Sequence, residues 1–487
     1  MNAEERLLID GELVPAASGR TYPNINPATE EVMGEVADAG PEDMERAIAS
    51  ARRAFDETDW STNHAFRLKC LEQLKQGLLA EMEEFKQQIA AETGAPLGIC
   101  GASGPQCELP IGFIDYSLEH LPRYEWSRDI GVNEIMGGKN RRLVENEAIG
   151  VVAAITPWNV PLQINLAKCV PALAAGCTVI LKAAPDTPWS ATTLGRIVAE
   201  HTDIPAGVFN VITSEDPKEV GDQLVGDPRV DMVSFTGSTA VGKHIMARAS
   251  GTVKKVFLEL GGKSANIILD DADLSSSLLS ALAVCFHAGQ GCALNTRLLV
   301  PRDKQAEVEE LLKTYFGFIT YGDPSSESEI MGPQVNARQR ERVLAYIEKG
   351  KQEGARVLLG GGTPDNLDTG YYVEPTVFVD VTNDMTIAQE EIFGPVLCVI
   401  AHDGDDDAVR IANDSYFGLS GSVWSASEER ALAVARRIRT GTINVNGGNF
   451  YGADAPFGGY KQSGIGREMG LEGFEEYLET KTIAIAV

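Results

Sequence analysis

The chain has 487 residues, of which 44% are hydrophobic and 23% are charged, a length that predicts two or three domains and a balance typical of soluble globular proteins. Its 42 basic and 70 acidic side chains give a net charge of −28, which repels nucleic acid and anionic membranes and excludes polyanion binding as the main task. The start lacks the pattern of a secretory signal, and no apolar run reaches the roughly 18 residues of a membrane span, so we expect a cytoplasmic protein.

The eight cysteines and six histidines give no sign of a metal centre. The cysteines form no CxxC pair and no other metal-like spacing, and the histidines are scattered. Reduced thiols are expected in a long chain of this kind, and no metal site is predicted.

A regular alternation of apolar runs begins near residue 147. Continuous Val/Ile runs separated by helical patterns are typical of a parallel sheet covered on both faces. The predicted strands are 148–158, 177–184, 207–213 and 230–235, and the predicted helices are 161–176, 189–201 and 239–249.

A second alternation follows residue 269 and predicts another α/β domain. Its first helix is expected over 273–289, where an Asp or Ser caps the start. The other predicted helices are 304–316 and 339–354, and the predicted strands are 297–301, 395–402, 420–425 and 442–447. The patterns at 140–146 and 481–487 fit neither rhythm, and we expect them to pair as strands at an edge or with another subunit.

Two strand ends are candidate phosphate or ribose sites. Gly237 and Ser238 lie between a strand and a helix that contains Gly242, so backbone N–H groups can approach a ligand phosphate. A plain turn explains this segment equally well, because it lacks the G-x-G-x-x-G fingerprint. Lys182 ends another strand, where ligands of open sheets collect, although a surface lysine is the simpler interpretation.

Three further residues have the chemistry of an acyl-transfer site. Asn159, in "ITPWNVPL", has an amide suited to an oxyanion, but Asn and Pro are also ordinary turn residues. Glu259 is one acid in the apolar run "FLELGG", where desolvation raises the pKa as a general base requires, although a carboxylate that caps a backbone turn is the alternative. Cys292 follows Gly-Gln-Gly, which permits close ligand approach, yet a lone cysteine is more often a core residue. Cys285, seven residues earlier, is predicted to be core.

Seven segments together resemble the aldehyde dehydrogenase superfamily in the hydrolytic, non-acylating branch. They are "INPATEEVMGEV", "ITPWNVPL", "FTGSTAVG", "LELGGKS", "GQGCALNTR", "QEEIFGPVL" and "PFGGYKQSGIGRE", in the family's order over nearly the full chain. The resemblance implies two Rossmann-like open parallel-sheet domains and a small β segment for oligomerisation. It places the coenzyme domain at 1–125 and 148–258, the catalytic domain at 259–460 and the oligomerisation segment at 126–147 and 461–487.

The resemblance also implies a mechanism. The Cys292 thiolate adds to an aldehyde, the Asn159 amide and the Cys292 N–H hold the oxyanion, hydride leaves, and Glu259 activates the water that hydrolyses the thioester. Lys168 and Glu468 would relay the proton. The implied cofactor residues are Ile155, Thr156, Pro157, Trp158, Lys182, Phe235, Gly237, Ser238, Gly242, Leu260, Gln339, Arg342, Glu391 and Phe393.

The cofactor is predicted to be NAD, which most members of the family use. One departure favours some use of NADP: the residues after Lys182 are Ala183, Ala184 and Pro185, where NAD-preferring members often carry a glutamate that holds the ribose hydroxyls. Without that carboxylate, Lys182 can accept a 2′-phosphate.

The implied substrate pocket contains Val160, Gln163, Ala167, Phe450 and Tyr451. These positions are mostly apolar and include no arginine, so we expect an uncharged aromatic, terpenoid or medium-chain aldehyde. The alternatives are a semialdehyde dehydrogenase, a dehydrogenase that acylates coenzyme A, a cysteine esterase and a non-catalytic binding protein. A homodimer or homotetramer is expected, with a small-molecule aldehyde as the only other partner.

Overall fold

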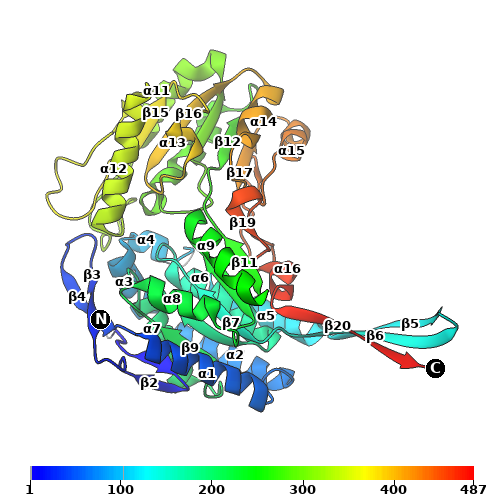
Figure 1. Ribbon diagram of the computed structural model, residues 1–487. Helices are drawn as coiled ribbons and strands as arrows, with labels where there is room; N and C mark the ends of the chain where they lie inside the picture. Colours follow the sequence, from blue (N-terminus) through cyan, green and yellow to red (C-terminus); the bar gives the residue numbers. More distant parts are fainter. Residues whose placement is uncertain (1–2, 102–103) are drawn as a thin grey trace.

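The computed structural model describes residues 3–101 and 104–487 and has two lobes, each built on one large sheet (Figure 1). In the sheet of the first lobe the five inner strands are parallel and the three outer ones are antiparallel. Its order is β19 (Gly464–Ile465), β11 (Lys255–Glu259), β10 (Met232–Thr236), β7 (Val151–Ile155), β8 (Thr178–Lys182), β9 (Phe209–Ile212), β1 (Leu7–Ile9) and β2 (Glu12–Val14).

Helices cover both faces of this sheet because its strands are apolar on both sides. Val152 and Ala154 of β7 join one core cluster, and Val151 and Ala153 join another, as expected for a buried parallel strand. The first cluster includes side chains of α2 (His64–Ala80), α3 (Met82–Thr93), α5 (Ile111–His120), α6 (Pro161–Ala175) and α7 (Trp189–His201). The second includes α1 (Pro41–Glu57), α8 (Pro217–Gly226) and α9 (Thr239–Ala249).

The second lobe has a seven-stranded sheet in which only the edge strand β14 is antiparallel. Its order is β14 (Arg356–Leu359), β15 (Thr376–Val379), β16 (Val396–His402), β13 (Arg297–Pro301), β12 (Ala265–Ile268), β17 (Gly421–Trp424) and β18 (Asn444–Val445). Its helices are α10 (Leu274–Ser277), α11 (Gln305–Phe316), α12 (Ala337–Gln352), α13 (Thr386–Gln389), α14 (Asp405–Asn413) and α15 (Glu428–Ala435). The predicted fold class, two open α/β sheets, is confirmed.

A three-stranded antiparallel sheet projects from the first lobe (Figure 1). It consists of β20 (Leu478–Ala486), β6 (Gly138–Ala148) and β5 (Ser127–Ile135). Ile483 pairs with Leu143, so the two segments that fitted neither rhythm do pair with each other. The predicted oligomerisation segment 461–487 is divided: β19 joins the eight-stranded sheet, α16 (Gly470–Glu475) packs on α6, and β20 joins the projecting sheet.

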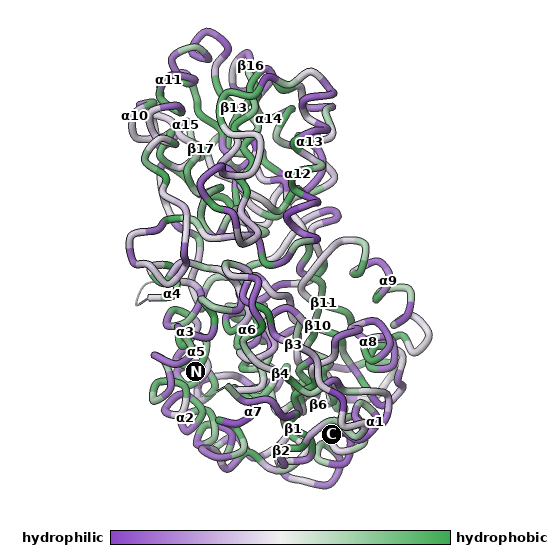
Figure 2. The backbone as a smooth tube through the Cα atoms, turned by 90° about the vertical axis from the view of Figure 1, so that its left-hand side faces the viewer, coloured by the Kyte–Doolittle hydropathy of each residue, from purple (hydrophilic) through white to green (hydrophobic). Residues whose placement is uncertain are grey.

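The remaining elements are short. Strands β3 (Thr21–Ile25) and β4 (Val32–Ala37) form a hairpin, and α4 (Leu97–Cys100) precedes α5. Figure 2 shows hydrophobic segments inside both lobes and hydrophilic ones along their outer helices. Among the described residues, no helix is both long enough and apolar enough to span a membrane.

Candidate active site

Glu259 lies where the chain passes from one lobe to the other. It is the last residue of β11, and only five residues separate it from β12 in the other sheet. This short link packs closely against two other segments of the chain. A Cβ added to Gly261 would lie 2.3 Å from Oε2 of Glu391, and one added to Gly262 would lie 2.5 Å from the carbonyl oxygen of Cys292. The two glycines therefore permit the close approach that brings three predicted site segments together.

Cys292 follows a break in the predicted helix 273–289. Asp273 caps the helix start by accepting a hydrogen bond from the N–H of Ser275, as expected. The helix then continues as a 3₁₀ segment, η3 (Leu278–Gly289), in which His287 and Ala288 have φ of 49° and 51°. This left-handed backbone is uncommon outside glycine and marks a functional or strained segment. The helix therefore ends earlier than predicted, and its last residues form the turn that precedes the cysteine.

Cys292 differs from the other seven cysteines because it alone is partly exposed. Cys285 is fully buried, as predicted for a core residue. Burial raises the pKa of the Cys292 thiol well above its ordinary value, and the nearby charges of Glu259 and Glu391 raise it further. The thiolate, which is the nucleophilic form, therefore needs local stabilisation before Cys292 can react.

Asn159 lies in the loop between β7 and α6 and reaches the cysteine segment directly. Its Nδ2 donates a hydrogen bond of 2.9 Å to the carbonyl oxygen of Gln290, two residues before Cys292. An amide nitrogen has two N–H donors, so one remains for a ligand oxygen beside the sulfur.

The Glu259 carboxylate is buried and has no hydrogen-bond partner for either oxygen among the described residues. Burial raises its pKa well above the ordinary value, and the negative charge of Glu468 raises it further, while Lys168 lowers it. Both properties suit a general base that binds a water molecule.

Lys168 and Glu468 form a buried ion pair near this carboxylate. The Lys168 Nζ lies 3.0 Å from Oε1 of Glu468 and 3.3 Å from the hydroxyl of Ser234, which is itself 3.1 Å from the hydroxyl of Tyr477. The structure therefore brings together the two residues predicted to relay a proton, and it adds two hydroxyl groups that the sequence did not single out.

The predicted cofactor residues of the first lobe lie at the carboxyl ends of its strands. Ser238 caps α9 by accepting from the N–H of Val241, and Gly242 packs on Leu260, whose side chain a Cβ at Gly242 would approach to 2.7 Å. A Cβ at Gly237 would lie 2.5 Å from the ring of Phe235. Packing within the chain therefore requires these two glycines. The exposed start of α9, where a ligand phosphate is expected to approach, is a second reason for them.

The β7 and β8 ends form the other wall of this region. Lys182 is the last residue of β8, beside Ile155, and its carbonyl oxygen accepts from the N–H of Thr156. Its buried Nζ donates to the Ala183 carbonyl oxygen, and burial lowers its pKa to about 8. The loop continues through Pro157 to Trp158, whose ring meets that of Phe393 edge to face at 5.4 Å.

The remaining cofactor candidates lie in the second lobe and contact one another. Arg342 of α12 donates to the Glu391 carbonyl oxygen at 2.8 Å, and Gln339 donates to that of Phe393 at 2.8 Å. The Glu391 carboxylate accepts from the N–H of Gly262 at 2.9 Å, and burial raises its pKa to about 7. The lobes therefore meet across a set of polar groups that fits a dinucleotide placed between them.

The predicted substrate residues lie on two segments. Val160, Gln163 and Ala167 are at the start of α6, and Phe450 stacks on Phe457 at 5.7 Å. The Tyr451 hydroxyl and the Gln163 Oε1 are buried without a partner among the described residues.

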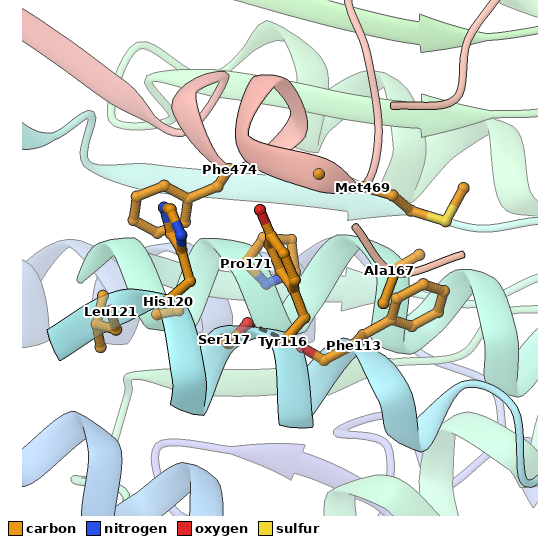
Figure 3. Close-up of a pocket in the computed structure, with 12 residues that line it drawn as sticks. Phe113, Tyr116, Ser117, His120, Leu121, Ala167, Pro171, Met469 and Phe474 are labelled. Carbon is orange, nitrogen blue, oxygen red and sulfur yellow. Dashed lines mark hydrogen bonds between the residues drawn. The ribbon is translucent and has the colours of Figure 1, made fainter. Parts of the chain in front are cut away.

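A cleft between α5, α6 and α16 begins at Ala167 (Figure 3). The side chains of Phe113, Tyr116 and His120 face Pro171, with Met469 and Phe474 on the opposite side. Its twelve lining residues include no lysine, arginine, aspartate or glutamate. Of the five predicted substrate residues, Ala167 lines this cleft.

The sequence reasoning missed two glutamines that hold the site. Gln290 donates from its side chain to the His287 carbonyl oxygen at 3.0 Å and accepts from the N–H of Val335. Gln106 donates to the Asn159 carbonyl oxygen at 2.9 Å. The position of Gln290 inside "GQGC" was a signal, whereas nothing in the sequence around Gln106 points to the site.

Among residues 3–101 and 104–487, no group of three His, Cys, Asp or Glu is arranged to hold a metal ion.

Comparison with known proteins identifies the family. The model of the aldehyde dehydrogenase family matches residues 13–483. The chain is 43% identical to 3-succinoylsemialdehyde-pyridine dehydrogenase of a Pseudomonas species, over 98% of this chain and 97% of the relative. It is 39% identical to a putative aldehyde dehydrogenase, DhaS, of Bacillus subtilis, over 99% and 96% of the two chains.

Solved structures agree. A mutant aldehyde dehydrogenase C of Pseudomonas syringae, in complex with NAD+ and octanal, superposes with a TM-score of 0.93 at 41% identity, over 99% of this chain and 96% of that one. Betaine aldehyde dehydrogenase of Staphylococcus aureus, in complex with NAD+, gives 0.95 at 37%, over 99% and 95%. The predicted resemblance and enzyme class are confirmed, and the chain belongs to the aldehyde dehydrogenase family.

Proposed function

We propose that this enzyme oxidises an uncharged, apolar aldehyde to its carboxylic acid with NAD as the hydride acceptor. The observation that carries the proposal is that Asn159, Glu259 and Cys292 come together from three segments. The Asn159 side chain donates to the carbonyl oxygen of Gln290, two residues before Cys292. Gly262, in the link after Glu259, lies against the carbonyl oxygen of Cys292.

The Cys292 sulfur adds to the aldehyde carbon, and the new oxyanion accepts hydrogen bonds from the free N–H of Asn159 and the N–H of Cys292. The nicotinamide ring of NAD, when bound, accepts the hydride that leaves as the carbonyl reforms. The residues that would hold NAD are those around Lys182, Ser238 and Glu391. The crystal structures of the relatives with NAD+ support this choice.

Glu259 then removes a proton from water, which attacks the thioester and releases the acid and the Cys292 thiolate. Neither oxygen of Glu259 has a hydrogen-bond partner within residues 3–101 and 104–487, which supports hydrolysis over transfer to coenzyme A. From Glu259 the proton passes toward the ion pair of Lys168 and Glu468, which we propose as the relay.

The apolar substrate is supported by the cleft at Ala167, which has no charged lining residue (Figure 3). The octanal complex of the Pseudomonas syringae relative is consistent with a medium-chain aldehyde. Aromatic and terpenoid aldehydes fit the same cleft chemistry, because the rings of Phe113, Tyr116 and Phe474 line it.

The decisive experiment is NADH formation at 340 nm with octanal, benzaldehyde, citral, betaine aldehyde and succinic semialdehyde, each with NAD and with NADP. We expect the highest kcat/KM for an uncharged member, no activity for Cys292→Ala, and unchanged products when coenzyme A is added. A best kcat/KM for a charged aldehyde would overturn the substrate proposal. Ester hydrolysis without any aldehyde-dependent NADH would overturn the dehydrogenase activity itself.

Cytoplasmic localisation and the domain boundaries stay predictions.

We also propose a homodimer or homotetramer joined through the projecting sheet. Strands β5 and β20, together with the residue that follows each of them, leave apolar side chains exposed, as expected for a surface that another subunit covers. These are Ile130, Val132, Ile135, Met136, Ile483, Ile485 and Val487.

A further inference from the structure

We propose that Gln106 is a positioning residue for the oxidation: by holding the main-chain carbonyl of Asn159, it aims the Asn159 amide at the substrate oxygen. The inference rests on the proposed function, because it assigns Asn159 to the oxyanion. It concerns a residue that no site motif contains and that lies 53 positions from its partner.

Asn159 is fixed at both of its ends. Its side-chain Nδ2 binds the Gln290 carbonyl oxygen at 2.9 Å, and its main-chain carbonyl oxygen accepts from Nε2 of Gln106 at 2.9 Å. With one N–H of the amide committed to Gln290, the direction of the second N–H depends on where the backbone of Asn159 sits. A bond to that backbone therefore controls the geometry of the oxyanion donor.

The loop that carries Asn159 is held by its contacts with other segments. The Thr156 N–H donates to the Lys182 carbonyl oxygen, the Trp158 ring packs on Phe393, and the His287 ring lies beside the Asn159 main chain. The loop connects β7, which ends at Ile155, to α6, which begins at Pro161. Pro157 and Pro161 have no N–H to donate, and the loop contains no strand or helix ladder. A bond from outside the loop is thus required to hold its middle.

Gln106 is buried where it can supply that bond. It is 1% exposed, and its neighbour Cys107 is fully buried in the core that also contains α5 and α6. The other amide atom, Oε1, is buried without a partner among the described residues. An unsatisfied buried oxygen is costly, and rotating the amide by 180° would place oxygen against oxygen, so the side chain is retained in the orientation that serves Asn159.

The test is a double-mutant cycle between Gln106→Met and Asn159→Ala. Methionine has a similar length and no N–H, so it removes the bond with little change in volume. For Asn159→Ala we expect a loss of about 10²-fold to 10³-fold in kcat. For Gln106→Met we expect a loss of about tenfold in kcat and in the rate of the first-turnover NADH burst, with both KM values within about twofold of wild type.

In the double variant we expect no loss beyond that of Asn159→Ala alone, because a positioning residue has nothing left to position. The matched control is Gln223→Met, which removes a glutamine that also donates to a main-chain carbonyl, that of Pro41, in another part of the lobe. It should leave kcat unchanged.

A second variant covers the case in which Gln106→Met is unfolded at the assay temperature, as judged by its Tm. Gln106→Glu has the same shape, repels the carbonyl when ionised and donates to it when protonated. Its kcat relative to wild type should therefore rise as pH falls. A Gln106→Met variant with the kcat of wild type would overturn the inference. So would a Gln106→Met change that lowers kcat by the same factor in wild type and in Asn159→Ala. A ratio of the Gln106→Glu kcat to the wild-type kcat that does not change with pH would also overturn it. If wild type forms no NADH from any aldehyde, it is the proposed function that fails.

Discussion

Two acidic groups of the site oppose ionisation of one another. Burial raises the pKa of both Cys292 and Glu259, and the charge of Glu259 adds to the rise at Cys292. Ionisation of one group therefore makes ionisation of the other harder. A nearby positive charge, such as the ring of a bound cofactor, would favour the thiolate.

The first prediction concerns this coupling. In Glu259→Gln the negative charge near Cys292 is removed, so the pKa of the thiol falls and the pH profile of its alkylation by iodoacetamide shifts to lower pH. Stopped-flow or mass-spectrometric alkylation rates between pH 6 and pH 10 measure the shift. Glu57→Gln, an exposed change on α1, should leave the profile unchanged. A midpoint at or above that of wild type would contradict the coupling.

The same variant separates the two chemical steps. Without the base, the acyl-enzyme accumulates, so Glu259→Gln should give one equivalent of NADH in a burst and then a steady-state rate lower by about 10²-fold. Intact-protein mass spectrometry should detect the acyl adduct on Cys292. Steady-state turnover without a burst would show that Glu259 is not the hydrolytic base.

A third prediction follows from the buried amine of Lys182. Burial lowers its pKa to about 8, so the amine is charged below that pH and neutral above it. If it binds the ribose or a phosphate of the cofactor, KM for NAD should rise as pH passes 8, while KM for the aldehyde stays constant. Lys182→Met should have a KM for NAD higher by about tenfold and independent of pH, since a lost hydrogen bond to a charged group is worth about 1.5 kcal/mol. A pH-independent KM in wild type would argue against this contact.

At the scale of elements, the segment 286–292 is held in a conformation that its own sequence disfavours. His287 and Ala288 have positive φ, and Gly289 follows with φ of 75°. A Cβ at Gly289 would lie 2.0 Å from the carbonyl oxygen of Gly394, a main-chain atom that cannot rotate away. The packing of the second lobe therefore imposes the turn that presents Cys292.

Gly289→Ala should consequently destabilise the protein by about 2 kcal/mol or more. It should also lower kcat, because the cysteine segment has to shift. Urea unfolding with matched m-values measures the first effect. Gly251→Ala is the control, since a Cβ there meets no atom within 4 Å. An unfolding midpoint equal to that of wild type would show that the loop adapts freely.

The elements that the sequence predicted well are those decided by local pattern. The inner strands β7, β8 and β10 are short, mostly apolar runs that are buried on both faces, and α9 has the predicted bounds because Ser238 caps it. The break at Phe286 was not predictable, since Gly394 and its neighbours impose it from more than 100 residues away. Gln106 was missed for the same reason: its bond to the Asn159 carbonyl oxygen joins two segments 53 residues apart, which no local pattern shows.

At the scale of the whole molecule, the site is formed by the meeting of two lobes and not by either sheet alone. Residues 260–264 join β11 of one sheet to β12 of the other, and the contact of Trp158 with Phe393 and the bond from Asn159 to Gln290 tie the second lobe to the same place. The carboxyl end of the first sheet and the amino end of the second therefore face one crevice, because β12, β13 and β16 begin after the link, Cys292 and Phe393, respectively. Open α/β sheets bind ligands beyond the carboxyl ends of their strands, which here is the edge of the first sheet.

The projecting sheet is the part of the molecule that a single chain does not cover, and it gives the last prediction. Ile483 and Ile485 of β20 lie on one face, because alternate residues of a strand share a face, and they are 39% and 41% exposed. Replacing both by lysine should weaken association, since two charges would have to be desolvated in the interface. Light scattering coupled to size-exclusion chromatography should then show a smaller assembly than in wild type at equal concentration.

The control for this prediction is Thr482→Lys with Ala484→Lys, which places the same charge on the opposite face of the same strand. A loss of association in the control alone would assign the interface to that face, and an unchanged mass in both variants would exclude β20 from it.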